Sequence, residues 1–182
     1  MKATGIVRRI DDLGRVVVPK EIRRTLRIRE GDPLEIFTDR EGEIILKKYS
    51  PIGELGQFAK QYADSLAQTT GHIVAITDKD QFIAVAGPTK KDLLTKSISH
   101  ELEEVINERE TIVAAKDDKN YIRIMNEDDS EFVYQAILPI ISEGDAIGSV
   151  IFLTKDAKTK FGDLEIKLAA TAANFMGRQM EQ

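Results

Sequence analysis

The chain has 182 residues and a formal net charge of −5, with 42% hydrophobic residues, 31% charged residues and no cysteine. This composition is typical of a folded globular protein and argues against intrinsic disorder. Without cysteine the sequence can form no disulfide, no thiolate metal site and no thiol nucleophile.

Membrane insertion and secretion are not expected from the sequence. No apolar run approaches the roughly eighteen residues that a membrane-spanning helix needs. The first residues, MKATGIVRRIDD, lack the apolar core of a signal peptide. We therefore expect a cytoplasmic protein.

The charge is divided unevenly along the chain. Residues 1–50 hold 12 Lys/Arg against 9 Asp/Glu, for +3, whereas residues 51–182 hold 14 against 22, for −8. Residues 1–29 alone hold 9 basic and 3 acidic side chains, for +6. Because salt screens charges beyond about 8 Å, such a patch can attract a polyanion despite the negative total. The sequence thus indicates a basic module followed by an acidic one.

Short elements are predicted in the basic module from β-branched runs, turn residues and a proline. They are strands over 4–10 and 15–18 around a turn at 11–14, a helix over 20–26 after Pro19, and a hairpin of strands 34–38 and 43–48. About fifty residues bury little surface as a monomer. We therefore predict that two copies complete one intertwined β-barrel dimer.

Longer elements are predicted after Ser50-Pro51 from helical and alternating spacing of apolar residues. They are a helix over 51–70, strands over 72–77 and 81–86, a helix from a capping box at Thr89 to 108, weaker strands over 112–115 and 121–125, a hairpin of 132–141 and 146–153, and a helix over 163–180. This order predicts an α+β fold in which helices flank an antiparallel sheet.

Arginines are concentrated around the first turn and the short helix, at Arg8, Arg9, Arg15, Arg23 and Arg24. The guanidinium group offers a planar fork of donors that fits phosphate oxygens and guanine edges. Only Glu21 is acidic between Gly14 and Arg29, so these arginines are expected to lack local acidic partners. The alternative is an ordinary solvated surface.

Residues 1 to about 50 resemble the AbrB family of transition-state regulators. The resemblance rests on GIVRRIDDLGRVVVPKEIRRTL from Gly5, followed by EGD at Glu30 and LEI at Leu34. It implies a swapped-hairpin β-barrel dimer that binds double-stranded DNA, formed by residues 1–52. The DNA-contacting residues that it implies are Arg8, Arg9, Arg15, Arg23 and Arg24, with Lys2 and Lys20 as phosphate contacts.

Residues 53–182 resemble a GAF domain, through the stretch AILPIISEGDAIGSVIFL from Ala136. Gly148 within it suggests a place where backbones pack closely. The resemblance implies a sensory or oligomerisation domain, and the sequence leaves open both whether it binds a small-molecule effector and which effector that is. No cofactor is expected. The polar segment 117–130 is either a lid or a solvated loop, and the loop is favoured.

The two histidines do not suggest a metal site. His100 and Glu104 stand four residues apart on a predicted helix, and His72 begins a strand. Zinc needs three or four ligands, so surface or capping roles are favoured over metal binding.

Apolar residues on the first and last helices of the second module could serve packing or assembly. Packing within the domain is the ordinary role of apolar residues at helical spacing. If some of them remain exposed, helices of neighbouring chains could form a bundle and join two dimers into a homotetramer. The residues are Tyr62, Leu66, Phe175, Met176 and Met180.

The function predicted from these features is a DNA-binding transcription regulator, activator or repressor, whose second module oligomerises it. A protein-interaction module of the antitoxin type, without a direct DNA role, is the alternative. Its tail is usually disordered, whereas residues 51–182 show helix and strand periodicity. An enzyme is disfavoured, because no nucleophile, base and orienting group fall in a recognisable motif.

Overall fold

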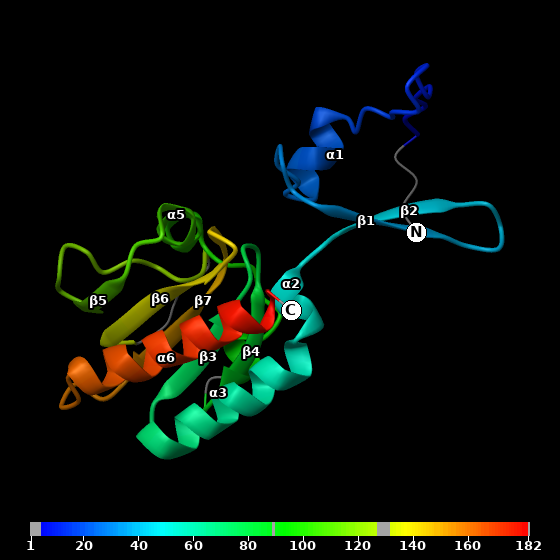
Figure 1. The fold of residues 1–182 in the computed structure, drawn as a ribbon. Helices are drawn as coiled ribbons and strands as arrows, with labels where there is room; N and C mark the ends of the chain where they lie inside the picture. Colours follow the sequence, from blue (N-terminus) through cyan, green and yellow to red (C-terminus); the bar gives the residue numbers. More distant parts are fainter. Residues whose placement is uncertain (1–4, 89, 127–131, 182) are drawn as a thin grey trace. The chain divides into compact units, whose positions relative to one another are not determined.

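The structure is a computed structural model that describes residues 5–88, 90–126 and 132–181 (Figure 1). The chain divides into two compact units, Met1–Tyr49 and Ser50–Gln182, which are described separately. Within the described residues, no helix is both long enough and apolar enough to span a membrane.

Unit 1 holds one short helix and one hairpin. Helix α1 spans Lys20–Thr25, and strands β1 (Leu34–Thr38) and β2 (Ile44–Lys48) pair antiparallel, with Leu34 opposite Lys48. These elements confirm the predicted helix and hairpin to within a residue at each end. Pro19 lies just before the helix, as its N-cap, where its missing N–H removes no hydrogen bond.

The predicted strands over 4–10 and 15–18 are not found in the described residues of this single chain. Residues 5–10 and 15–18 are extended or irregular and pair with no strand, and Thr4 lies outside the described residues. A strand exists only through hydrogen bonds to a neighbour. The sequence pattern and the β-propensity therefore identified segments that are suited to pairing as strands. One chain alone supplies no partner strand for them.

Unit 2 is built on a five-stranded sheet in the order β4-β3-β7-β6-β5, in which all neighbours are antiparallel (Figure 1). The strands are β3 (Ile73–Thr77), β4 (Phe82–Ala86), β5 (Ile112–Ala115), β6 (Tyr134–Ser142) and β7 (Asp145–Thr154). The predicted hairpin of 132–141 and 146–153 is the β6–β7 pair. The α+β fold with helices flanking an antiparallel sheet is confirmed.

Helices cover both faces of this sheet. Helix α3 (Gly56–Thr70) packs on β3 and β4, and α6 (Asp163–Gln179) packs on β6 and β7 on the same face. The opposite face is covered by α4 (Lys90–Leu93) and α5 (His100–Glu108) with the segments beside them.

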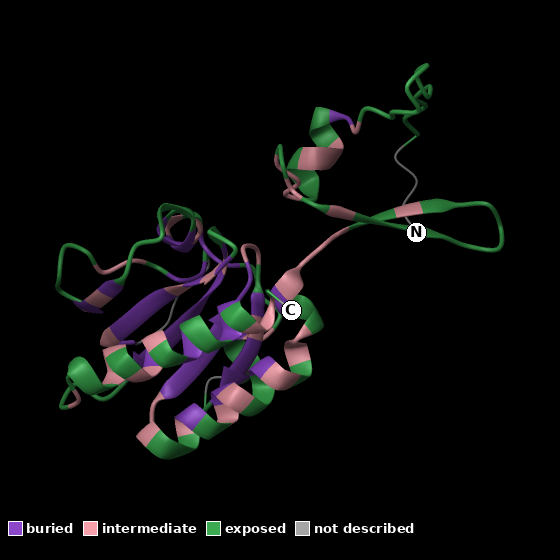
Figure 2. Cartoon of the chain, viewed as in Figure 1, coloured by how far each residue is buried: buried purple, intermediate pink, exposed green. Residues whose placement is uncertain are grey.

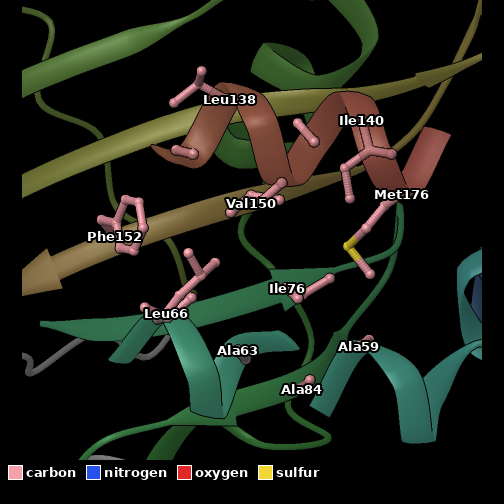
Figure 3. Packing of buried hydrophobic residues seen from close by; sticks show 14 of the residues in the cluster. Ala59, Ala63, Leu66, Ile76, Ala84, Leu138, Ile140, Val150, Phe152 and Met176 are labelled. Atoms are coloured by element: carbon pink, nitrogen blue, oxygen red, sulfur yellow. The ribbon is translucent and has the colours of Figure 1, made fainter. Parts of the chain in front are cut away.

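The central strands are buried on both sides as a result (Figure 2). In β3, Val74 and Ile76 join the cluster under α3 and α6, whereas Ile73 and Ala75 join the cluster under α5. Small residues line the first cluster, where Ala59 and Ala63 of α3 face the sheet (Figure 3). This alternation explains why β3 and β7 are nearly continuous apolar runs in the sequence.

Two predicted helices are interrupted. The helix predicted over 51–70 is two helices, α2 (Pro51–Glu54) and α3, with a break at Leu55. The helix predicted from Thr89 to 108 is also two, α4 and α5, and Thr89 itself lies outside the described residues. Between α4 and α5, Thr95 has φ +65°, and its N–H donates to the carbonyl of Phe82 at 3.0 Å. Pairing with the sheet edge thus overrides the helical pattern.

Residues 121–125, predicted as a strand, form only an isolated bridge between Ile98 and Met125. A side chain takes the place of a neighbouring backbone here. With its amide oriented to satisfy both groups, buried Gln135 donates to the carbonyl of Ile122 at 3.0 Å and accepts from its N–H at 2.7 Å. Strand propensity alone cannot reveal that a side chain replaces the backbone partner here, because that side chain belongs to a residue in another strand.

Helix α6 is fixed to the sheet at both ends. Near its C-terminus, a Cβ added at Gly177 would overlap the carbonyl oxygen of Ile141 in β6. In β7, a Cβ at Gly148 would overlap the carbonyl oxygen of Thr77, which confirms the close packing expected there. Both positions require glycine because backbones approach each other, not because of their φ angles.

At the N-terminal end of α6, His72 meets Glu165. The two side chains are each 12% exposed, with His72 Nε2 3.3 Å from Glu165 Oε1. The other carboxylate oxygen accepts the N–H of Gly162 at 2.8 Å, half of a capping box. Burial by itself raises the pKa of Glu165, but the hydrogen bonds from Gly162, from its own N–H and from His72 outweigh it and lower that pKa.

Substitution of Gly177 by alanine should destabilise unit 2. Overpacking at this contact should lower the free energy of unfolding by about 1–3 kcal/mol, measured by urea denaturation. Gly56→Ala is the control, because a Cβ there would lie 3.9 Å from Ile83 Cγ2 and alanine favours a helix by up to about 1 kcal/mol. Equal stability of both variants would contradict the close approach.

Substitution of Glu165 by glutamine should make unfolding less dependent on pH. Because the folded state lowers the pKa of Glu165, its carboxylate stabilises the fold above the unfolded value of 4.5, and this contribution is lost as pH falls through the folded pKa. Glu165→Gln should lower the free energy of unfolding by about 1 kcal/mol near pH 7, with the difference shrinking below pH 4.5. Asp163→Asn, an exposed change in the same turn, should show a smaller difference, and a gap independent of pH would argue against the carboxylate.

Candidate nucleic-acid interface

The turn at residues 11–14 is organised by one carboxylate. Asp11 Oδ1 accepts the N–H of Leu13 at 3.0 Å and the N–H of Arg15 at 2.8 Å, and the Asp11 carbonyl accepts the N–H of Gly14 at 3.0 Å. Gly14 has φ +76°, which a residue with a Cβ adopts only with strain. Asp-Asp-Leu-Gly therefore forms a fixed turn.

Arg15 leaves this turn with a local acidic partner. Its Nε donates to Asp11 Oδ2 at 2.8 Å, and its side chain is 70% exposed. Hydrogen bonds from the N–H and side chain of Arg15 lower the pKa of Asp11. The expectation that the arginines lack acidic neighbours is therefore wrong for Arg15, because its partner stands before Gly14.

The other predicted DNA-contacting residues differ in environment. Arg8 and Arg9, just before the turn, are exposed, as are Lys20 and Arg24 on α1. Arg23 is half-buried, and its Nε is buried without a hydrogen-bond partner. Within the described part of the chain, none of these five side chains forms an ion pair. Lys2 lies outside the described residues.

These basic side chains fall into two groups. The N–H of Asp11 donates to the carbonyl of Arg15 at 3.1 Å, so the two arms of the turn run together and hold Arg8, Arg9 and Arg15 around it. Helix α1 carries Lys20, Arg23 and Arg24. No hydrogen bond between described residues joins side chains of the two groups.

The end of α1 is attached to the hairpin by a second acidic residue. Asp32 Oδ2 accepts the N–H of Arg29 at 2.8 Å and lies 3.2 Å from Lys48 Nζ, which also donates to the carbonyl of Arg27 at 2.9 Å. Burial raises the pKa of Asp32, but the bonds from Arg29 and Lys48 outweigh it and lower that pKa. This link attaches the segment that follows α1 to β2.

Apolar side chains are exposed throughout unit 1. Eleven of the thirteen large apolar side chains exposed among the described residues belong to it, and Val7 and Val17 are 89% and 71% exposed. The eleven are Ile6, Val7, Ile10, Leu13, Val16, Val17, Leu26, Ile36, Phe37, Ile44 and Leu46. Large exposed apolar patches on soluble proteins mark interaction sites, so these side chains are candidates for an interaction surface.

Unit 2 exposes an aromatic group on α3 and α6. Phe58, Tyr62 and Phe175 stack on one another, with ring centroids 5.6–6.1 Å apart, and Phe175 is 39% exposed. Of the other residues predicted for packing or assembly, Leu66 and Met176 are buried in the core, and Met180 is half-buried. The sequence analysis missed Phe58, although its spacing of four from Tyr62 places it on the same face.

Among the described residues, neither histidine belongs to a group of three or more potential metal ligands, and the one such group lies at the β1–β2 hairpin. His100 Nε2 lies 3.6 Å from Glu104 Oε1 on the surface, and His72 is engaged elsewhere, with Glu165. At the β1–β2 turn, Asp39, Glu41 and Glu43 approach one another, but Asp39 already accepts the backbone N–H groups of Glu41 and Glu43. The Asp39 carboxylate therefore organises this turn.

Comparison with known proteins identifies both parts of the chain. The family model "Stage V sporulation protein T C-terminal, transcription factor" matches residues 54–181, and "Antidote-toxin recognition MazE, bacterial antitoxin" matches residues 7–54. Stage V sporulation protein T of Bacillus subtilis (strain 168) is 57% identical over 182 residues, covering 100% of both chains.

Two further matches concern the separate modules. Transition state regulatory protein AbrB of the same organism is 67% identical over 51 residues, which are 28% of this chain and 52% of that protein. The GAF domain from Acinetobacter phosphoenolpyruvate-protein phosphotransferase has a TM-score of 0.58 at 10% identity, covering 69% of this chain and 81% of that one, and shows the fold of unit 2. The chain therefore belongs to the stage V sporulation protein T family of transcription factors, with an AbrB-type DNA-binding domain before a GAF-like domain.

Proposed function

We propose that this transcription regulator acts in spore development as a homo-oligomer. Residues 1–52 of two chains form an intertwined barrel that binds double-stranded DNA, and residues 53–182 join two such dimers into a tetramer. The observation that carries the proposal is the combination, in unit 1, of an exposed apolar surface with basic side chains that retain available donors.

The intertwined dimer is supported by what unit 1 leaves uncovered. Burying one Val, Leu, Ile or Phe side chain is worth about 1.5–3 kcal/mol, so eleven exposed ones constitute a large driving force for association. Residues 5–10 and 15–18 have strand-forming sequences and no strand partner. A second copy of the same segments supplies both the missing strand partners and the missing cover.

DNA binding in this proposal uses Arg8, Arg9, Arg15, Arg23 and Arg24, with Lys2 and Lys20 at phosphates. Twofold symmetry places two equivalent sets of these side chains on one dimer. Arginine forks can form bidentate contacts with guanine O6 and N7 or with phosphate oxygens. Lysine ammonium groups suit phosphates, because they act as compact point charges.

The tetramer is supported by the aromatic group on α3 and α6. Phe58, Tyr62 and Phe175 form an apolar surface on two antiparallel helices, and such helix pairs associate into four-helix bundles. Joining two dimers makes the second DNA-binding event intramolecular, so affinity for paired sites increases through effective concentration.

The GAF-like fold of residues 53–182 supports a second role, the binding of a small-molecule effector. An effector acts on DNA binding only through a difference in its affinity for two states of the oligomer. A bundle of helices between dimers offers such states, because a small change in helix packing alters the separation of two DNA-binding surfaces.

The antitoxin model that matches residues 7–54 favours a second candidate function, a protein-interaction module without a direct DNA role. The two candidates differ in their behaviour with DNA. A regulator binds duplex DNA with an affinity that falls steeply with salt. An antitoxin-like module captures a partner protein and needs no affinity for a random duplex.

Binding of the full chain to random-sequence duplex DNA should fall linearly on a log–log plot against salt concentration. Arg15→Ala and Arg23→Ala should each weaken binding by about tenfold or more, with the thermal midpoint unchanged. Arg40→Ala, an exposed arginine at the hairpin turn, should bind like the wild type. Absence of binding at low salt would favour the protein-interaction module, and a large loss of thermal stability would make the altered arginine structural.

Substitution of Phe175 by aspartate should convert the tetramer into dimers, because it places a charge in the aromatic group. Light scattering should show the mass halved, and affinity for duplexes that hold two dimers should fall roughly 100-fold. Gln68→Asp, an exposed change on α3 away from the aromatic group, should leave the tetramer intact. A wild-type chain that runs as a dimer would contradict the proposed assembly.

A further inference from the structure

Asp11 bonds to Arg15 at both its backbone and its side chain. Asp11 Oδ1 accepts the N–H of Arg15 at 2.8 Å, while Oδ2 accepts from Arg15 Nε at 2.8 Å. The same Oδ1 accepts the N–H of Leu13 at 3.0 Å. Every one of these contacts lies within residues 11–15, so the arrangement requires no other part of the fold and no second chain.

This contact leaves the two terminal nitrogens of the Arg15 guanidinium group available. Among the side-chain donors of arginine, Nε is the one nearest the backbone. Its bond to Asp11 therefore restrains the side chain at the near end of the guanidinium group. Neither terminal nitrogen, Nη1 or Nη2, bonds to any residue that the structure describes, and the side chain is 70% exposed. The two Nη groups can therefore form a bidentate contact while Nε remains bonded to Asp11.

An acidic residue at this position opposes the attraction of phosphates. Residues 1–29 carry a net charge of +6, and Asp11 reduces that charge where DNA contacts are proposed. Hydrogen bonds from Arg15 lower the pKa of Asp11, so it is ionised at neutral pH. A carboxylate here weakens binding to any duplex unless it also orients a neighbouring group toward its contact with DNA.

We propose that Asp11 is a positioning residue that determines specificity, because it holds the Arg15 guanidinium group in one orientation, from which its terminal nitrogens contact a base edge. This inference rests on the proposed function, in which Arg15 contacts DNA. An arginine ordered before binding loses less conformational freedom on contact, and the gain is realised only where a base offers two acceptors in the matching direction. Asp11 thus reduces general affinity for DNA and increases discrimination between sequences.

A purely structural role makes a different prediction. The turn needs only an acceptor at Oδ1, and asparagine provides one. In one orientation, the asparagine NH2 group stands at the Oδ2 position and places a donor against the Arg15 Nε donor. In the flipped orientation, the NH2 group stands at the Oδ1 position and the turn loses its acceptor. Asp11→Asn therefore retains the turn and removes the contact to the Arg15 side chain.

The test measures discrimination by the full chain. A duplex selected by the wild-type protein from a random library serves as the specific site, and random duplex serves as the reference. Asp11→Asn should bind random duplex as well as or better than wild type, but its ratio of specific to random affinity should fall about threefold to tenfold. Asp12→Asn is the matched control. It removes the same charge one residue away, where the exposed side chain forms no hydrogen bond or ion pair with a described residue, and should leave the ratio unchanged.

Two further variants test whether Asp11 acts through the fork of Arg15. Arg15→Lys retains the charge and the Asp11 turn but has no fork, and it should lose the same ratio. In the double variant of Asp11→Asn with Arg15→Ala, the ratio should match that of Arg15→Ala alone, because Asp11 acts through Arg15.

The outcomes separate this inference from the proposed function. If Arg15→Ala lowers the ratio but Asp11→Asn behaves like Asp12→Asn, or if the two losses add in the double variant, Asp11 only forms the turn and the inference is overturned. If Arg15→Ala changes neither affinity nor ratio, Arg15 does not contact DNA, and both the proposed contact and the inference that depends on it fail.

Discussion

The shortage of internal cover in the first 49 residues is the constraint on which the proposed architecture depends. Unit 1 has one short helix, one hairpin and eleven exposed large apolar side chains, and its described residues form no hydrophobic core in a single chain. A chain this short buries a small fraction of its surface and is marginal as a monomer. In the proposed dimer, self-association is therefore part of folding, and the DNA surface forms only with a partner copy. Its stability then depends on protein concentration.

Unit 2 meets the opposite condition, because its sheet is covered on both faces by its own helices and loops. Its backbone contacts leave no room for a side chain at Gly148 and Gly177, and Glu165 and His72 fix one end of α6. A rigid module of this kind can hold the aromatic group of Phe58, Tyr62 and Phe175 in a constant geometry. The proposed tetramer depends on this rigidity, because effective concentration depends on how well the spacing between two dimers is defined.

The sequence predicted most of unit 2 because its elements carry their own signals, whereas contacts between distant segments were not readable. The β6–β7 hairpin and α6 followed from spacing of apolar residues. The break between α4 and α5 did not, because it depends on Thr95 pairing with Phe82, and the anchoring of residues 121–125 depends on Gln135 in β6. In unit 1 the arginines were evident, but Asp11 was treated as a turn residue. The tendency of an aspartate that opens a turn to accept the backbone N–H groups after it was the signal that could have placed Asp11 beside Arg15.

The distribution of charge explains how an acidic protein can act on DNA. At distances beyond about 8 Å salt screens all of its charges, so the net −5 neither steers the chain toward DNA nor prevents close contact. Once unit 1 reaches the duplex, the +6 of its residues 1–29 acts at short range, while the acidic residues of unit 2 disfavour additional, non-specific contacts. Asp11 applies the same principle to one side chain. It lowers the affinity for every DNA sequence and leaves Arg15 oriented for a particular one. The charge pattern therefore increases the difference between specific and non-specific affinity, and not the specific affinity itself.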